Sequence, residues 1–115
     1  MAVYRAKRNP NRCPSHPGEL LRETVLPAVD LTKVEIAAAL GVSRTHLDNI
    51  LKEKVGVSPT VAVKLGKLFG NGPDLWVQMQ AAYDTWQALR TVKTDDIKPA
   101  KVKAHMRDAV PRTGA

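Results

Sequence analysis

The feature that most constrains the fold is the stretch 33–52, which reads KVEIAAALGVSRTHLDNILK. Apolar residues recur at helical spacing on both sides of a glycine, which predicts two short helices joined by a tight turn. Gly41 occupies the position where the first helix must end and the chain must reverse. Ser43 can then accept backbone N–H bonds as the N-cap of the second helix. This layout predicts a helix-turn-helix of the kind that binds DNA.

The second helix of the pair is expected to expose a hydrogen-bonding face. Its outward positions hold side chains that suit base edges and phosphates better than the Glu and Lys of an ordinary solvated helix. These residues are Arg44, Thr45, His46, Asp48, Asn49 and Lys52. The alternative is structural, because two packed helices of any all-α bundle can also show a glycine turn and an N-cap.

Length and charge bound the domain organisation. The 115 residues leave room for one domain, and the aliphatic composition with few aromatics favours a small all-α fold. The net charge of +7 is uneven, with +4 on residues 1–15, +3 on residues 93–115 and zero between them. We therefore expect a flexible basic arm over 1–15, a helix-turn-helix domain over 16–90 and a basic tail over 91–115. Basic arms on a neutral domain favour a polyanionic partner such as DNA, and solubilising tails are the alternative.

The chain shows no signature of a membrane protein or an enzyme. No apolar run is long enough to cross a bilayer and no signal peptide is recognisable, so we expect a cytoplasmic protein without membrane contact. Cys13 is the single cysteine, and His16, His46 and His105 are scattered, so no disulfide or metal motif is present. Because no constellation of acid, base and nucleophile stands out, we predict neither catalysis nor a metal or cofactor.

Capping signals divide the chain into five helices. The first begins at Pro17 with Ser15 or His16 as its cap, and it should end before Pro27, since a proline disfavours the α region for the residue that precedes it. Thr32 and Glu35 form a capping box that starts the second helix. The predicted helices span about 17–26, 33–40, 43–52, 58–69 and 73–90.

The last helix carries an apolar stripe. Trp76, Met79, Tyr83 and Trp86 fall at i, i+3, i+7 and i+10. Such a stripe is usually core. A domain of this size offers limited core, however, so we predict that part of the stripe is buried by a second copy in a homodimer, and all four residues are candidates for that interface.

With these residues in view, the chain resembles the HigA-type, or VapI-like, antitoxins of the Xre and lambda-repressor-like helix-turn-helix group. The segment HPGELLRETVLPAVDLTKVEIAAALGVSRTHLDNIL is similar to the opening of that family. The segment SPTVAVKLGKLFGNGPDLWVQMQAAYD is similar to its second signature, with Trp76, Gln80, Tyr83 and Asp84 at the marked positions. The resemblance covers residues 16–90.

The resemblance implies a five-helix, lambda-repressor-like domain that binds operator DNA as a homodimer and represses its own operon. It also implies an antitoxin that neutralises a cognate ribosome-dependent, mRNA-cleaving toxin. Base contacts would fall on Arg44, Thr45 and Asn49, and phosphate contacts on Ser43, Lys52 and Ser58. Asp48 departs from the pattern and could accept from cytosine or pair with Arg44. A stand-alone transcriptional repressor without a toxin partner is the alternative.

The toxin-binding surface is expected on the neutral domain, because a basic toxin would be repelled by the arms. The candidates are the acidic residues Glu19, Glu23 and Glu35. We expect the C-terminal arm to contact DNA.

Overall fold

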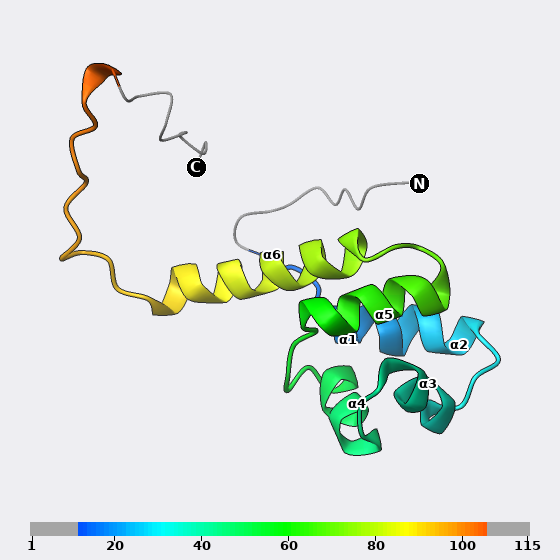
Figure 1. The fold of residues 1–115 in the computed structure, drawn as a ribbon. Coiled ribbons are helices and arrows are strands. Elements are labelled where there is room, and N and C mark those ends of the chain that lie inside the picture. The colour runs from blue at the N-terminus through cyan, green and yellow to red at the C-terminus, as the bar shows by residue number, and fades with distance from the viewer. Residues whose placement is uncertain (1–11, 106–115) are drawn as a thin grey trace.

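A computed structural model describes residues 12–105 and shows five helical rods, with no strand among those residues (Figure 1). The first rod consists of α1 (Pro17–Leu20), a π-helical turn η1 (Leu21–Val25) and α2 (Leu26–Ala28). The other four are α3 (Lys33–Leu40), α4 (Arg44–Leu51), α5 (Pro59–Phe69) and α6 (Asp74–Thr91). The predicted all-α, five-helix architecture is confirmed.

The first rod continues past Pro27, so the prediction that this proline ends the helix is wrong. Leu26 keeps helical angles, with φ −60° and ψ −43°, and its N–H bonds to the carbonyl of Leu21 five residues earlier. This π-type register widens the turn ahead of the proline, where an α-helical carbonyl would clash with the ring. The rod ends at Ala28, because Val29 is extended.

Two helix starts are capped by side chains in the way the sequence indicates. The Thr32 hydroxyl accepts from the N–H of Glu35 at 3.1 Å, and the Glu35 carboxylate accepts from the N–H of Thr32 at 3.0 Å. The hydrogen bond from the Thr32 backbone is the main reason that the pKa of the Glu35 carboxyl lies below its usual value. At α1, Nδ1 of His16 accepts from the N–H of Gly18 at 2.9 Å, so His16 is the cap.

The core lies where all five rods meet. α5 packs on α3 and α6, α1 packs on α4 and α6, and α3 packs on α4. The first rod and α5 therefore separate the α3–α4 pair from α6, as Figure 1 shows. The buried apolar cluster contains Leu21, Ile36, Ala37, Leu40, Leu47, Ile50, Leu51, Val57, Val61, Ala62, Leu65 and Trp76.

The crossing of α1 and α4 depends on Gly18. A Cβ atom at this position would collide with the carbonyl oxygen of Ile50, so the two helices can approach this closely only because the residue has no side chain. The glycine of the HPGE tetrapeptide thus fixes the first rod against the second helix of the helix-turn-helix.

The segment after Thr91 leads away from the helical body, and the side chains of residues 92–105 are exposed (Figure 1). Most of the predicted N-terminal arm, and the end of the predicted C-terminal tail, lie outside the described residues, so the predicted domain limits stay predictions. No helix within residues 12–105 is both long and apolar enough to span a bilayer.

Candidate nucleic-acid interface

α4 has one buried face and one exposed face, as its sequence pattern predicts. The buried residues are Leu47, Ile50 and Leu51. Among the predicted base-reading residues, Arg44 and Thr45 are exposed and Asn49 is half-buried. The structure therefore brings all three onto one short helix, although their contacts with bases remain predictions.

The predicted phosphate-binding residues lie at helix ends and are exposed. Oγ of Ser43 accepts from the N–H of His46 at 3.0 Å, and Oγ of Ser58 accepts from the N–H of Val61 at 3.2 Å. Capping uses an acceptor lone pair, so each hydroxyl proton can still be donated to a phosphate oxygen. Lys52 directly follows the last residue of α4.

The turn between α3 and α4 is a Schellman motif. Gly41 has a φ of 68°, in the left-handed region that favours glycine. The N–H of Val42 bonds to the carbonyl of Ala37 at 3.0 Å, and the N–H of Gly41 bonds to that of Ala38 at 3.1 Å. Val42 also packs against the core, so the angle at which α4 leaves the turn is fixed.

Asp48 forms ion pairs on the exposed face of α4. Its carboxylate lies 3.7 Å from Nε of Arg44, which is the pairing expected as one alternative from the sequence. It also lies 3.8 Å from Nζ of Lys33, a residue of α3 that the sequence did not single out. All three side chains are about a third to a half exposed, so each pair contributes only about 0 to 1 kcal/mol. Both cations can therefore exchange the carboxylate for a phosphate or a base at little cost.

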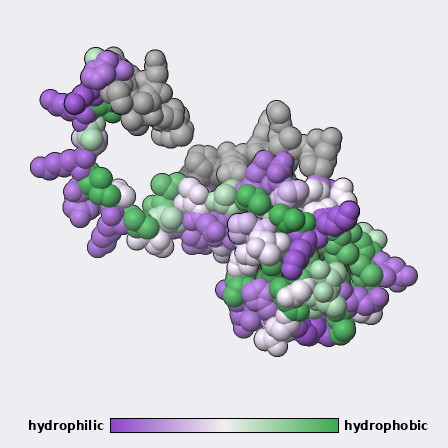
Figure 2. Space-filling model, viewed as in Figure 1, coloured by the Kyte–Doolittle hydropathy of each residue, from purple (hydrophilic) through white to green (hydrophobic). Residues whose placement is uncertain are grey.

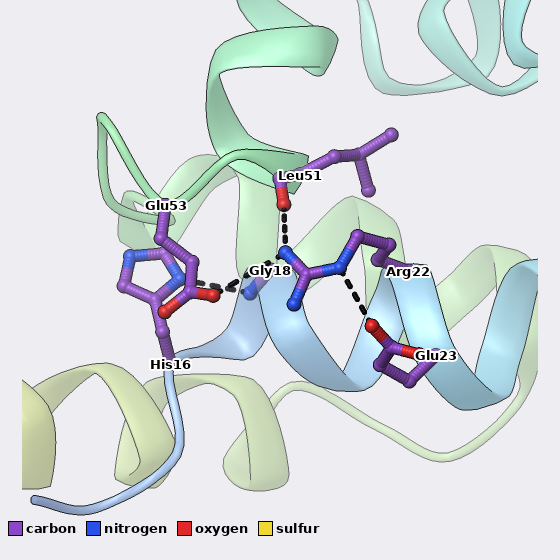
Figure 3. A network of polar contacts seen from close by, with 6 residues as sticks. All are labelled: His16, Gly18, Arg22, Glu23, Leu51 and Glu53. Atoms are coloured by element: carbon purple, nitrogen blue, oxygen red, sulfur yellow. Dashed lines mark hydrogen bonds and ion pairs between the residues drawn. The ribbon is translucent and has the colours of Figure 1, made fainter.

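Arg22 holds the far end of α4, a role that sequence reasoning missed (Figure 3). Its Nη1 donates to the carbonyl oxygen of Leu51 at 2.6 Å and lies 3.3 Å from the carboxylate of Glu53. Its Nε donates to Glu23 at 2.9 Å. A cation at a helix C-terminus satisfies an orphan carbonyl and opposes the negative end of the dipole. No local signal marks this role, because the contact joins residues about thirty positions apart.

Comparison with known proteins places this geometry in a family. A helix-turn-helix family model matches residues 21–76. Virulence-associated protein I of Dichelobacter nodosus is 39% identical over 69 residues, 60% of this chain and 64% of that protein, so the chain spans slightly less than two thirds of its length. Antitoxin HigA-1 of Vibrio cholerae is 35% identical over 79 residues, 69% of this chain and 74% of the relative. The chain belongs to the HigA-type family of helix-turn-helix antitoxins.

A solved structure of a HigA protein has the same fold. Pseudomonas aeruginosa antitoxin HigA with the higBA promoter aligns with a TM-score of 0.64 and 30% identity, over 75% of this chain and 97% of that chain. Membership of the HigA-type family confirms the lambda-repressor-like fold and the prediction that the chain is a helix-turn-helix regulator and not an enzyme.

The two HigA-type signatures meet in space. Oε1 of Gln80, on α6, accepts from the N–H of Val57 at 2.7 Å, and its Nε2 donates to Asp84 at 2.9 Å. The ring of Tyr83 lies edge-on to that of His16, with centroids 4.8 Å apart. α6 is thus tied to the start of α1 and to the loop that follows α4. The sequence contains both motifs but not this contact, since more than sixty residues separate them.

His16 is buried at this junction, and burial lowers its pKa. The charges of Glu53 and Asp84 and a hydrogen bond with the Val55 backbone act in the opposite direction. Nδ1 of His16 accepts a hydrogen bond from the N–H of Gly18, so this nitrogen carries no proton in the folded domain and the ring is neutral.

We predict that stability falls as the pH is lowered past the ordinary histidine pKa of 6.5. His16 takes up a proton more readily in the unfolded chain than in the folded chain. The free energy of unfolding should therefore keep its full value above that pH and decrease below it. Thermal unfolding between about pH 8 and pH 5 should show this decline, and it should be flatter in His16→Gln. His105→Gln, which changes an exposed histidine, should keep the parent profile. Parallel profiles for the parent and His16→Gln would contradict the assignment.

The apolar stripe of α6 is divided between core and surface. Trp76 and Met79 are buried within the protomer, so they are core residues and the prediction that they form a dimer interface is wrong. Tyr83 and Trp86 are half-buried, and the guanidinium of Arg90 lies 3.8 Å above the ring of Trp86. A dimer contact by Tyr83 and Trp86 stays a prediction.

The three candidate toxin-binding acids are not equivalent. Glu19 and Glu23 are exposed on the first rod and line a shallow pocket of about 230 Å³ together with Leu20. Glu35 is exposed too, but its carboxylate caps α3. Glu19 and Glu23 therefore share one surface, whereas the Glu35 carboxylate is used to cap α3.

Proposed function

We propose that this chain is an antitoxin that binds operator DNA as a homodimer, represses its own operon and neutralises a cognate ribosome-dependent, mRNA-cleaving toxin. The observation that carries the proposal is the exposed polar face of α4, which is fixed at one end by the Gly41 turn and at the other by Arg22. The similarity to a HigA structure solved with its promoter supports it.

DNA reading is assigned to α4. Its eight residues make a helix about 12 Å long, which a major groove accommodates. Arg44, Thr45 and Asn49 would contact base edges, and Ser43, Lys52 and Ser58 would contact phosphates. The two kinds of contact have different roles, because phosphate contacts fix the position of the protein on the duplex and base contacts set its sequence preference.

The dimer contact is assigned to the outer half of α6, which extends past the other helices (Figure 1). Leu89 is 79% exposed and Val92 is 60% exposed, and both line a shallow cavity of about 290 Å³ with Ala88. Figure 2 shows hydrophobic residues on this end of α6 and on the segment that follows it. A second copy would cover these side chains together with Tyr83 and Trp86, because an exposed apolar strip on a small domain is typical of an interface. A two-fold axis there would set two α4 helices for successive major grooves, about 34 Å apart.

The toxin surface is assigned to the neutral domain, and the basic tail to DNA. Glu19 and Glu23 offer paired carboxylates to a basic toxin, and Glu35 is the weaker candidate because it caps α3. The tail carries exposed lysines that could follow the phosphate backbone, namely Lys93, Lys98, Lys101 and Lys103. Both partners belong to the cytoplasm, where we place the protein.

Co-expression with the product of the adjacent gene tests the proposal. The adjacent product should inhibit growth alone, lose that effect beside this chain, and copurify with it; the chain by itself should sediment at twice its mass of 12.6 kDa. Reversing Glu19 and Glu23 to lysine should abolish copurification and leave DNA binding intact, whereas Asp95→Lys with Asp96→Lys serves as a charge-matched control on the exposed tail. An adjacent product that neither inhibits growth nor binds would leave the stand-alone repressor as the function.

A further inference from the structure

The loop after α4 contains an unusual backbone conformation. Glu53 has a φ of 62° and is the one non-glycine residue with positive φ among residues 12–105. Its N–H bonds to the carbonyl of Ile50 at 3.0 Å, and the N–H of Lys54 bonds to that of Asn49 at 2.9 Å. This is the Schellman ending already seen at α3, where glycine occupies the left-handed position. α5 also ends on a left-handed glycine, Gly70.

A glutamate at this position is strained, and glycine would form the same turn without strain. What glutamate adds is its carboxylate, which lies 3.3 Å from Nη1 of Arg22. That same nitrogen donates to the carbonyl of Leu51 at the end of α4 (Figure 3). The strained residue therefore completes a clamp between the first rod and the C-terminal end of α4. A retained local strain with a specific contact is a reason to look for a function.

The clamp lies beside the exposed face of α4. Arg22 lines a cavity of about 510 Å³ with Asp48 and Lys52. Lys52 is assigned to a phosphate contact, and Asp48 pairs with Arg44, which is assigned to a base. A shift of the C-terminal end of α4 would therefore move the side chains that read bases relative to those that hold phosphates.

We infer that Arg22 and Glu53 are positioning residues for sequence-specific DNA recognition, which rests on the proposed function. They fix the orientation of α4 so that Arg44 and Asn49 contact their bases when Lys52 and the serine caps contact the phosphates of the DNA. Arg22 does not itself contact DNA in this account, because its guanidinium is occupied by Leu51, Glu53 and Glu23.

Glu53→Gly is the decisive variant, because it keeps the left-handed turn and removes the side chain that carries the carboxylate. Binding is measured on a duplex of about three helical turns from upstream of the chain's own gene and on a shuffled duplex of equal composition. We expect the ratio of the two affinities to fall about tenfold, with unchanged slope of log affinity against log salt and no loss of thermal stability. Glu53→Gln, which retains an acceptor for Arg22, should restore most of the ratio.

Glu23→Gln is the matched control, because Glu23 also meets Arg22 but is not attached to α4. It should leave the ratio at the parent value. An unchanged ratio in Glu53→Gly would overturn the inference. So would an equal loss on both duplexes in Arg22→Gln with a slope shallower by about 0.9, because Arg22 would then be a phosphate contact. The proposed function is judged separately, since it fails if the parent chain itself does not discriminate between the duplexes.

Discussion

Replacing Trp76 with alanine should lower the free energy of unfolding by about 3 to 5 kcal/mol. The indole is fully buried in the central cluster, and its Nε1 donates to Oδ1 of Asn71 at 3.2 Å. The substitution removes a large apolar side chain, leaves a cavity between α6 and the rest of the core, and abolishes the bond that ties the α5–α6 connection to α6. For a domain whose total stability is about 5 to 15 kcal/mol, this loss removes a large share. Chemical denaturation monitored by helical circular dichroism measures it.

Trp86→Ala is the control for the same residue type on the same helix. Trp86 is half-buried, and we assign it to the dimer contact, so its loss should destabilise the protomer clearly less than the loss of Trp76. Equal destabilisation by the two substitutions would show that the division of the stripe into core and surface is wrong.

Local features of the fold could be predicted from the sequence because their causes are local. The capping box of Thr32 and the serine cap of α4 depend on residues three positions apart, and the Gly41 turn depends on one left-handed residue. The exposed face of α4 followed from the helical period, which places Thr45 and Asn49 opposite Leu47 and its buried neighbours.

Features that depend on other parts of the chain could not be predicted. Pro27 lies within its helix because the π turn before it removes the clash, and nothing in the residue pattern marks that turn. The stripe on α6 has one helical period, but whether a position is core depends on how far the other helices cover α6. Trp76 is fully buried, whereas Trp86 is half-buried.

Part of the candidate site could be predicted from the sequence, and part could not. Its exposed residues on α4 were identified, whereas the clamp of Arg22 on Glu53 was not, because it joins the first rod to the loop after α4, and these segments are distant in the sequence. Lys33 likewise reaches Asp48 only through the packing of α3 on α4.

Alanine substitutions on α4 should separate sequence reading from backbone binding. Arg44→Ala and Asn49→Ala should each reduce the binding free energy for the duplex from upstream of the chain's own gene by about 1 to 3 kcal/mol. Each should also relax the preference at one base position in each half-site. Lys52→Ala should weaken binding to the upstream and the shuffled duplex alike, and it should reduce the slope of log affinity against log salt by about 0.9. Fluorescence anisotropy against duplexes that carry single base changes measures both effects.

Lys54→Ala is the control for Lys52→Ala, because Lys54 is an exposed lysine of the following loop that we do not assign to DNA. It should leave both affinities near those of the parent. If Arg44→Ala and Lys52→Ala reduced binding to both duplexes by the same factor, the assignment of base-reading and phosphate-binding residues would have to be exchanged or abandoned.

The most direct test of the central claim is one titration of the parent chain at fixed, near-physiological salt, on the duplex from upstream of its own gene and on the shuffled duplex. If α4 reads an operator, the upstream duplex should bind at least about 1,000-fold more tightly than the shuffled one. Equal affinity for the two duplexes would mean that the basic charge of the chain alone holds DNA, and it would contradict the claim that this chain is an operator-binding antitoxin.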